Sequence, residues 1–430
     1  MTTRVLVISE DPVGSEMGGN AIRAYELAKA LGEHVAVTLA SPPAGGTAAG
    51  VDQVAFDRDD PGALRAHLRG VDVVVTLPQN PVVTAQLRRC GARIVYDLYD
   101  PKPLQMLEAF AAARGATRRY WSTIALDHVM EALALGDHFI CASERQRDLW
   151  IGAMLGAGLI SPALYSSDPT LRGMIDVVPF GVPAEPPEAT GVGPYERFGS
   201  LGGSEEMVLW NGGLWNWLDP LCAVEAIARV VERRPSARLL FMGRPPLVQA
   251  QAQAAAAARA RAAALGLLDE VVFFNDRWVP YRQRADWLLA ADCALSLHVE
   301  HLETRYSFRT RLLDCFWAGL PVVCTEGDEL AERVARERLG ITVAPADPQA
   351  VAEALVTVLG EGKQSHSDAL ARVAEDYRWP AVAAPLIDYV RDPPERLARR
   401  SHAVSSPGRL LRSSGTRAVR GLLRGWRRVS

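Results

Sequence analysis

Three arginines, Arg305, Arg309 and Arg311, fall within seven residues and precede a segment that is apolar at helical spacing. The N-terminus of a helix carries a partial positive charge, so arginines gathered there predict a binding site for an anion. Asp314 follows one turn later, where its carboxylate would accept hydrogen bonds from a diol. Aromatic residues lie between the arginines, which argues against the alternative of a fully solvated charged face.

Two glycine pairs offer further places for an anion. Gly18 and Gly19 follow the first apolar segment, and Asn20 is expected to N-cap the next helix, which would present free amides to an acceptor or its phosphate. Gly212 and Gly213 follow a second apolar segment, where the lack of side chains would let a diphosphate approach the backbone. An ordinary glycine turn is the alternative at both places.

The elements that must position these residues follow from hydrophobic patterning. In the first part of the chain we expect a helix over 20–31 and strands over 5–9, 35–39, 71–77, 93–98 and 138–142. In the second part we expect strands over 207–210, 237–242, 271–274, 293–297 and 322–324, with helices over 220–233, 281–290 and 310–318. Strands that alternate with helices predict an α/β fold of two Rossmann-like domains that face each other across a cleft, with ligands at the carboxyl ends of the strands.

Composition excludes several classes of protein. The chain has 430 residues, 49% of them hydrophobic, enough for two or three domains with full cores. Its net charge is −3, and the last forty residues alone contribute about +9, so the body is acidic and no nucleic-acid partner is expected. The six cysteines are scattered without a CxxC pair, which argues against a zinc site. Without a signal pattern or a long apolar run, we expect a cytoplasmic protein that does not span a membrane.

The segment 306–323 resembles the signature of family-4 glycosyltransferases of the GT-B fold, of the bacterial type. That signature reads Glu-Gly-Phe-Gly, four residues, Glu-Ala-Met-Ala, and then Gly-x-Pro-Val. Aligned on Gly319 and Pro321, Asp314 takes the second acidic position, and the first Glu, Gly and Phe fall at Tyr306, Ser307 and Phe308. Weaker similarities lie at both glycine pairs and at 178–182, 241–244 and 377–379, so the resemblance covers about residues 4–392.

The resemblance implies a nucleotide-sugar-dependent transferase that retains configuration. No metal or other cofactor is expected, because the aspartates of the segment 57–60 are interpreted as an acidic loop and not as the aromatic-Asp-x-Asp motif of metal-dependent nucleotide-sugar enzymes. Asp314 would hold the ribose diol, arginines and amides would hold the diphosphate, and the backbone of 277–279 would border the base. The residues expected to bind the donor are Gly212, Gly213, Arg244, Trp278, Glu303, Arg305, Tyr306, Ser307, Phe308, Arg309 and Asp314. The acceptor is expected over Gly18, Gly19 and Asn20.

This chain departs from the family pattern on the donor side. The first signature Glu is Tyr306 here, so we expect Glu303 or the amides of 307–309 to hold the donor sugar. The family's basic pair should fall near 213–219, where no basic residue occurs, so Arg244, Arg305 or Arg309 is expected to stabilise the departing diphosphate. His298 and His301 flank the signature; contact with a donor phosphate and a backbone hydrogen bond are the two alternatives.

A third departure concerns the catalytic residue. The segment 96–101 lacks the histidine that many retaining members carry near the reacting carbon. Asp100, at the end of a predicted strand, is therefore our candidate catalytic residue, either orienting the acceptor hydroxyl or acting as its base. A turn or N-cap aspartate before Pro101 is the alternative.

The predicted domains are an N-terminal acceptor domain over 1–183, a linker over 184–206 and a nucleotide-sugar domain over 207–375. A helix over 376–392 should cross back to the first domain, and a basic tail over 393–430 should follow. Within 408–430, leucines and Trp426 fall on one helical face and arginines on the other, which is typical of a helix on an anionic membrane. A disordered tail without function is the alternative, because three glycines weaken this helix.

Two other functions compete with the transferase. A noncatalytic partner that binds a nucleotide-sugar is compatible with the missing Glu and basic pair. A nicotinamide oxidoreductase is disfavoured because the first glycine turn is not GxGxxG. Donor nucleotide, sugar and acceptor stay open; a natural product, an oligosaccharide or a lipid-linked glycan of glycoconjugate biosynthesis would all fit.

Overall fold

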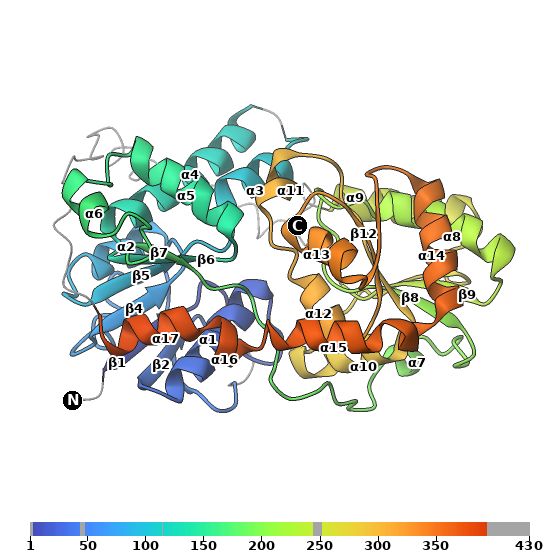
Figure 1. The fold of residues 1–430 in the computed structure, drawn as a ribbon, viewed down its shortest axis with the longest axis horizontal. Helices are drawn as coiled ribbons and strands as arrows, with labels where there is room; N and C mark the ends of the chain where they lie inside the picture. The colour runs from blue at the N-terminus through green and yellow to red at the C-terminus, as the bar shows by residue number, and fades with distance from the viewer. Residues whose placement is uncertain (1–2, 44–47, 114, 244–251, 394–430) are drawn as a thin grey trace, which may run out of the picture.

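The computed structural model describes residues 3–43, 48–113, 115–243 and 252–393. Two lobes lie side by side, each a parallel sheet covered by helices (Figure 1). The expectation of an α/β fold with two Rossmann-like domains is confirmed. Arg244, and the tail beyond Pro393, lie outside the described residues, so the predictions made for them rest on sequence alone.

The first lobe contains a parallel sheet in the order β3-β2-β1-β4-β5-β6-β7. Its strands are β1 Arg4–Ile8, β2 Ala36–Ser41, β3 Asp52–Ala55, β4 Val73–Thr76, β5 Arg93–Asp97, β6 His138–Cys141 and β7 Ile175–Val177. The central strands β4 and β6 are buried along their whole length, as expected for a sheet with helices on both faces. The helices are α1 Gly19–Gly32, α2 Pro81–Leu87, α3 Lys102–Ala109, α4 Ala116–Leu135, α5 Glu144–Gly156 and α6 Pro162–Ser167.

The second lobe contains a parallel sheet in the order β10-β9-β8-β11-β12-β13. Its strands are β8 Glu206–Trp210, β9 Ala237–Phe241, β10 Val272–Phe274, β11 Cys293–Ser296, β12 Val322–Thr325 and β13 Gly340–Val343. Its helices are α7 Pro194–Arg197, α8 Pro220–Arg233, α9 Gln253–Ala264, η2 Tyr281–Gln283, α10 Arg284–Ala290, α11 Leu302–Tyr306, α12 Arg311–Trp317, α13 Glu329–Glu337, α14 Pro348–Glu361, η3 Lys363–His366 and α15 Ser367–Glu375.

The strands β3, β7 and β13 were not expected from the sequence, which placed the last core strand of the chain at 322–324. All three lie at the edge of a sheet and are only partly buried. An edge strand pairs on one side only and packs against less of the core, so its apolar pattern is weaker. Short apolar segments of this kind do not stand out from loops in the sequence.

The last helices that the structure describes lie on the first lobe. After α15, the helices α16 Trp379–Val382 and α17 Ala384–Arg391 lie along the first lobe (Figure 1, red). Val182 N donates to Tyr377 O at 2.7 Å, and Trp379 N donates to Val182 O at 3.0 Å, so the two crossings between the lobes are joined to each other. His138 stacks on Tyr389 with ring centroids 4.2 Å apart, which anchors α17 to β6.

The helices of the described residues contain no segment that is both long and apolar enough to cross a membrane.

Candidate active site

The second glycine pair forms a turn of bare backbone after β8. This strand lies between β9 and β11, the point where the strand order of the sheet reverses and where open α/β sheets bind ligands. Gly212 has φ +127°, and a Cβ on Gly243 would lie 2.0 Å from the carbonyl oxygen of Gly212. Only glycine fits at Gly243, and the two loops therefore meet backbone to backbone.

Arg311 lies against this turn, at the first residue of α12. Its Nη2 donates to Gly213 O at 3.1 Å, and Asn211 Nδ2 donates to Arg311 O at 2.7 Å. Its Nη1 is buried without a hydrogen-bond partner, and the described residues include no carboxylate paired with this guanidinium. Burial, together with the nearby charge of Arg309, lowers the pKa of Arg311 to about 9. The turn is thus an electropositive site without an anion of its own.

Sequence analysis counted Arg311 among the clustered arginines but did not assign it to the site. The basic residues were sought between 213 and 219 because the family places them there along the chain. In the fold, Arg311 at the N-terminus of α12 contacts the same turn, although it lies far away in the sequence. The spacing of the arginines before the helix was the signal that pointed to it.

Asp314 lies one turn further along α12 and keeps partial access to solvent. Arg284 Nε lies 3.2 Å from Asp314 Oδ1, and 33% of the Asp314 side chain is exposed. The Arg284 guanidinium lies over the ring of Tyr281, 3.8 Å from its centroid, and 4.7 Å from that of Trp317. Arg284 therefore orients a carboxylate that can still accept hydrogen bonds from a diol.

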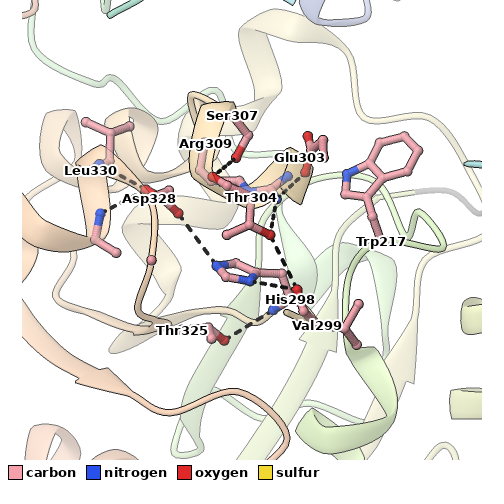
Figure 2. A network of polar contacts seen from close by, with 12 residues as sticks. Trp217, His298, Val299, Glu303, Thr304, Ser307, Arg309, Thr325, Asp328 and Leu330 are labelled. Carbon is pink, nitrogen blue, oxygen red and sulfur yellow. Dashed lines mark hydrogen bonds and ion pairs between the residues drawn. The ribbon is translucent and has the colours of Figure 1, made fainter. Parts of the chain in front are cut away.

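Glu303 and Arg309 form a buried ion pair. Arg309 Nη2 donates to Glu303 Oε2 at 2.7 Å, and only 1% of Glu303 is exposed. The other carboxylate oxygen, Oε1, has no hydrogen-bond partner. The charge of Arg309 is therefore already balanced, whereas Glu303 Oε1 can still accept a hydrogen bond (Figure 2).

Arg305 and Tyr306 lie apart from the glycine turn. Both line a cavity of about 500 Å³ between α5 of the first lobe and the second lobe. Neither Gly212, Gly213 nor any residue of α12 lines this cavity. The residues predicted to bind the donor are therefore split between two places.

The other predicted donor residues differ in their burial and in their contacts. Ser307 is buried, and its hydroxyl donates to Thr304 O at 3.0 Å. Phe308 is buried beside Tyr377, with ring centroids 6.3 Å apart, and acts as a core residue. Trp278 is half-buried in the loop that follows β10, two strands away from β8, which leads into the glycine turn.

The first glycine pair begins α1, but not as predicted. The N-cap is Gly18, and the helix starts at Gly19, so the prediction that Asn20 caps it is wrong. Asn20 lies in the first turn, where its side chain accepts a hydrogen bond from Tyr99 Oη at 2.9 Å. A side chain already inside the helix cannot fold back over the first amides, so a tertiary partner holds it instead.

Asp100 lies just after β5, on the side of the first lobe that faces α11. Its carboxylate accepts a hydrogen bond from Gln105 Nε2 at 2.9 Å, and Lys102 Nζ lies 3.9 Å away. Burial raises the pKa of Asp100, and the charge of Glu303 raises it further, against the opposing effects of Lys102 and Gln105. The charge of Glu303 on the second lobe thus acts on the predicted base of the first lobe.

Further contacts hold the two lobes together around this region. Tyr281 N donates to Ser15 O at 3.0 Å, and Tyr281 Oη donates to Glu26 at 2.8 Å. Gln146 Nε2 donates to Tyr99 O at 2.7 Å and to Tyr306 O at 2.9 Å. Sequence analysis did not identify Tyr281 or Gln146, because each acts on residues far away along the chain.

The described residues include no cluster of three or more His, Cys, Asp or Glu side chains able to hold a metal ion.

Comparisons with known proteins agree with this geometry. Residues 205–361 match the family model described as Glycosyl transferases group 1. No curated protein sequence matches the chain. Among solved structures, sucrose-phosphate synthase from Thermosynechococcus elongatus is similar at 17% identity and a TM-score of 0.66, over 90% of this chain and 98% of that one.

Two more solved structures resemble the chain over a similar extent. WaaG, a glycosyltransferase involved in lipopolysaccharide biosynthesis, matches at 16% identity and a TM-score of 0.62, over 90% of this chain and all of that one. HepE from Anabaena, in complex with UDP and glucose, matches at 14% identity and a TM-score of 0.64, over 90% and 99%. The second lobe, over residues 205–361, matches the group 1 glycosyl transferases, and the chain as a whole shares the two-lobed GT-B fold of these solved structures.

Proposed function

We propose that the protein transfers a sugar from a nucleotide-sugar donor to an acceptor hydroxyl, with the donor bound on the second lobe. One observation carries the proposal: Arg311 Nη1 is buried at the double-glycine turn without a hydrogen-bond partner. A donor diphosphate supplies the missing anion, since it is charged and can approach a backbone without side chains. Asp314, oriented by Arg284, then receives the ribose diol.

The proposed reaction uses both lobes. The acceptor oxygen forms a bond to the anomeric carbon of the sugar, the bond from that carbon to the diphosphate breaks, and the nucleoside diphosphate leaves. Arg311 stabilises the negative charge that builds on the leaving group. Asp100 orients the acceptor hydroxyl and accepts its proton, and its raised pKa makes it a stronger base than an ordinary aspartate.

In this proposal Glu303 holds the donor sugar in place of the family's acidic residue, which is Tyr306 here. The support is its buried Oε1 atom, which lacks a partner and can accept a hydrogen bond from a sugar hydroxyl. Arg309 fixes the other carboxylate oxygen and thereby orients the group. Retention of the anomeric configuration belongs to the proposal on the strength of the family resemblance, and NMR of the product's anomeric proton tests it.

Metal independence is part of the same proposal. A guanidinium at the glycine turn can do for the leaving diphosphate what a divalent cation does elsewhere. Transfer measured with EDTA and with added magnesium should proceed at equal rates. Dependence on magnesium would contradict this part and leave the donor site itself in place.

The first experiment is a thermal-shift screen of UDP-, GDP-, dTDP- and ADP-sugars. UDP-sugars come first, because HepE, which shares the fold, binds UDP-glucose in a solved structure. A ligand at 100 times its Kd stabilises the folded state by about 2.7 kcal/mol, so one nucleotide series should raise Tm. That rise should vanish in Arg311→Met. If no series changes Tm, the proposed donor site is refuted.

A second function is favoured by one observation. Tyr306 replaces the family's first acidic residue, which leaves room for a protein that binds a nucleotide-sugar and supports another transferase. Purified protein with a bound donor distinguishes the two functions. Hydrolysis or transfer of the sugar supports catalysis, and unchanged donor after prolonged incubation supports the noncatalytic partner.

We also propose that residues 408–430 bind an anionic membrane surface on the cytoplasmic side, which would favour a lipid-linked acceptor. The support comes from the sequence, where leucines and Trp426 oppose arginines on a helical wheel. Deletion of 408–430 should release the protein from vesicles that contain phosphatidylglycerol and should spare transfer to a water-soluble acceptor. Undiminished vesicle binding would contradict the proposal.

A further inference from the structure

Gln146 is a fully buried polar side chain in the first turn of α5, at the boundary between the lobes. Its Oε1 accepts from Ala142 N at 2.9 Å, and its Nε2 donates to Tyr99 O at 2.7 Å and to Tyr306 O at 2.9 Å. A backbone N–H only donates and a carbonyl oxygen only accepts, so these partners fix the orientation of the amide. Both of its N–H donors are therefore in use, one toward each lobe.

The partner of Gln146 in the first lobe is the loop that carries Asp100. Tyr99 directly precedes Asp100, so the hydrogen bond to Tyr99 O lies one peptide away from the proposed base. Trp150, one turn further along α5, donates from Nε1 to Leu98 O at 3.0 Å. One face of α5 thus holds two consecutive carbonyl groups of this loop.

The partner of Gln146 in the second lobe is the last residue of α11. This single-turn helix also carries Glu303, the residue proposed to hold the donor sugar. Tyr306 O accepts from Gln146, and Arg309 fixes one carboxylate oxygen of Glu303. One side chain therefore joins the backbone beside the proposed base to the helix that carries the proposed sugar-binding residue.

A second contact between the lobes begins at the neighbouring residue and leads elsewhere. Arg145 pairs with Glu332 on α13 and donates to the carbonyl oxygen of Gly327. This ion pair is open to solvent, since 55% of the Glu332 side chain is exposed. None of the residues proposed for the donor site lies on α13. Adjacent residues of α5 thus make two contacts between the lobes, and only the one from Gln146 reaches the proposed site.

We propose that Gln146 is a positioning residue that sets the distance between the base Asp100 and the donor sugar held by Glu303. The roles of Asp100 and Glu303 rest on the proposed function, whereas the hydrogen bonds that join their segments do not. Bond formation needs the acceptor oxygen close to the anomeric carbon, and a displacement of about 1 Å can lower a rate roughly 10²-fold. Loss of the Gln146 amide should therefore slow the reaction and leave the nucleotide site on the second lobe intact.

Two variants of the full-length protein test this role. Gln146→Glu keeps an acceptor for Ala142 N but replaces the NH₂ donor by a second carboxylate oxygen, which repels the two carbonyl oxygens. Gln146→Met has a similar length and adds no charge, and it replaces the glutamate variant should that variant fail to fold. Arg145→Ala is the matched control, because it removes the neighbouring contact between the lobes.

Turnover is measured as release of UDP from UDP-glucose with water as the acceptor, and UDP binding is measured by calorimetry. Both Gln146 variants should lower kcat at least tenfold and leave the Kd for UDP within twofold of the wild type. Arg145→Ala should keep the wild-type kcat. A side chain that only stabilised the fold would lower Tm and leave kcat of the folded protein unchanged.

Hydrogen exchange measured by mass spectrometry tests the contact without turnover. In Gln146→Glu the amides of 98–105 and of 303–310 should both exchange at least tenfold faster, while those of β4 and β8 keep their wild-type rates. Arg145→Ala should leave both segments unchanged. Faster exchange in one segment alone, or throughout the chain, would overturn the proposal, because Gln146 would then not join the two segments specifically.

Wild-type kcat in both Gln146 variants would also overturn the proposal, and so would an equal loss of kcat in Arg145→Ala. Failure of the proposed function is a different result: Asp100→Asn turns over UDP-glucose at the wild-type rate, or the wild type binds no nucleotide. If the wild type releases no UDP, the exchange measurement decides alone whether Gln146 joins the two segments. The two failures are therefore distinguishable.

Discussion

The double-glycine turn and the cavity between the lobes lie at neighbouring strand ends of one sheet, yet their electrostatics are opposite. The turn presents a guanidinium with no anion and almost no side chains. The cavity presents an excess of carboxylates over guanidinium groups. The turn suits a diphosphate, whereas the excess of carboxylates in the cavity would repel one.

The largest effect is expected at the turn. Arg311→Met should lower the transfer rate by about 10²- to 10³-fold, because the charge on the leaving diphosphate loses its main electrostatic partner. The same change should raise Tm of the free protein, since a desolvated guanidinium without a counter-ion destabilises the fold. Steady-state kinetics measures the expected loss of rate, and thermal unfolding measures the expected rise in Tm. A variant with lower Tm and full activity would refute the role of Arg311.

Asp100→Asn should lower the rate by about 10²-fold at neutral pH if Asp100 is the base. Because the pKa of Asp100 is raised, its carboxylate becomes protonated at a higher pH than that of an ordinary aspartate, whose pKa is about 4. As the pH is lowered, the wild-type rate should therefore begin to fall before this ordinary pKa is reached. This fall in rate at low pH should be absent from the pH–rate profile of Asp100→Asn.

The same shift has a consequence for stability. A carboxyl whose folded-state pKa is raised destabilises the fold where it is ionised, above that pKa. Asp100→Asn should therefore unfold at a slightly higher temperature than the wild type at pH 8, and the difference should shrink as the pH is lowered toward 4. A variant that is less stable at pH 8 would show that the carboxylate serves as a structural group.

Asp314→Ala should weaken binding of the nucleotide by about tenfold, the effect of losing roughly one hydrogen bond to a charged acceptor. The rate at saturating donor should change less than the affinity, because the ribose is remote from the reacting carbon. Calorimetric titration with UDP measures the affinity. An unchanged Kd would place the ribose elsewhere and would contradict the alignment of the signature.

The smallest effect is expected from the cavity. Glu300→Ala should change neither donor affinity nor the free energy of unfolding by more than about 0.5 kcal/mol, because this side chain is exposed. A large loss of donor affinity would erase the distinction between the two regions.

The sequence predicted the central strands and the buried edge strand β10 well, and the other edge strands poorly. Buried strands such as β4 are continuous apolar segments, whereas β3, β7 and β13 pack on fewer neighbours and are only partly apolar. Asn20 shows the same limit at the start of a helix: this good capping residue lies two positions beyond the N-cap Gly18, and its side chain is held by Tyr99. Local preference is overruled where a tertiary contact is available.

Patterning alone determined the α/β class, the two parallel sheets and the motif that carries Asp314, since these depend on residues close together in the chain. The tertiary structure decided which arginine serves the turn. Arg309 is neutralised by Glu303, Arg305 faces the cavity, and Arg311 contacts Gly213, which lies 98 residues away in the sequence. The physical reason is that the effect of a charge depends on its partners and its burial, and both are set by packing between segments that are far apart in the chain.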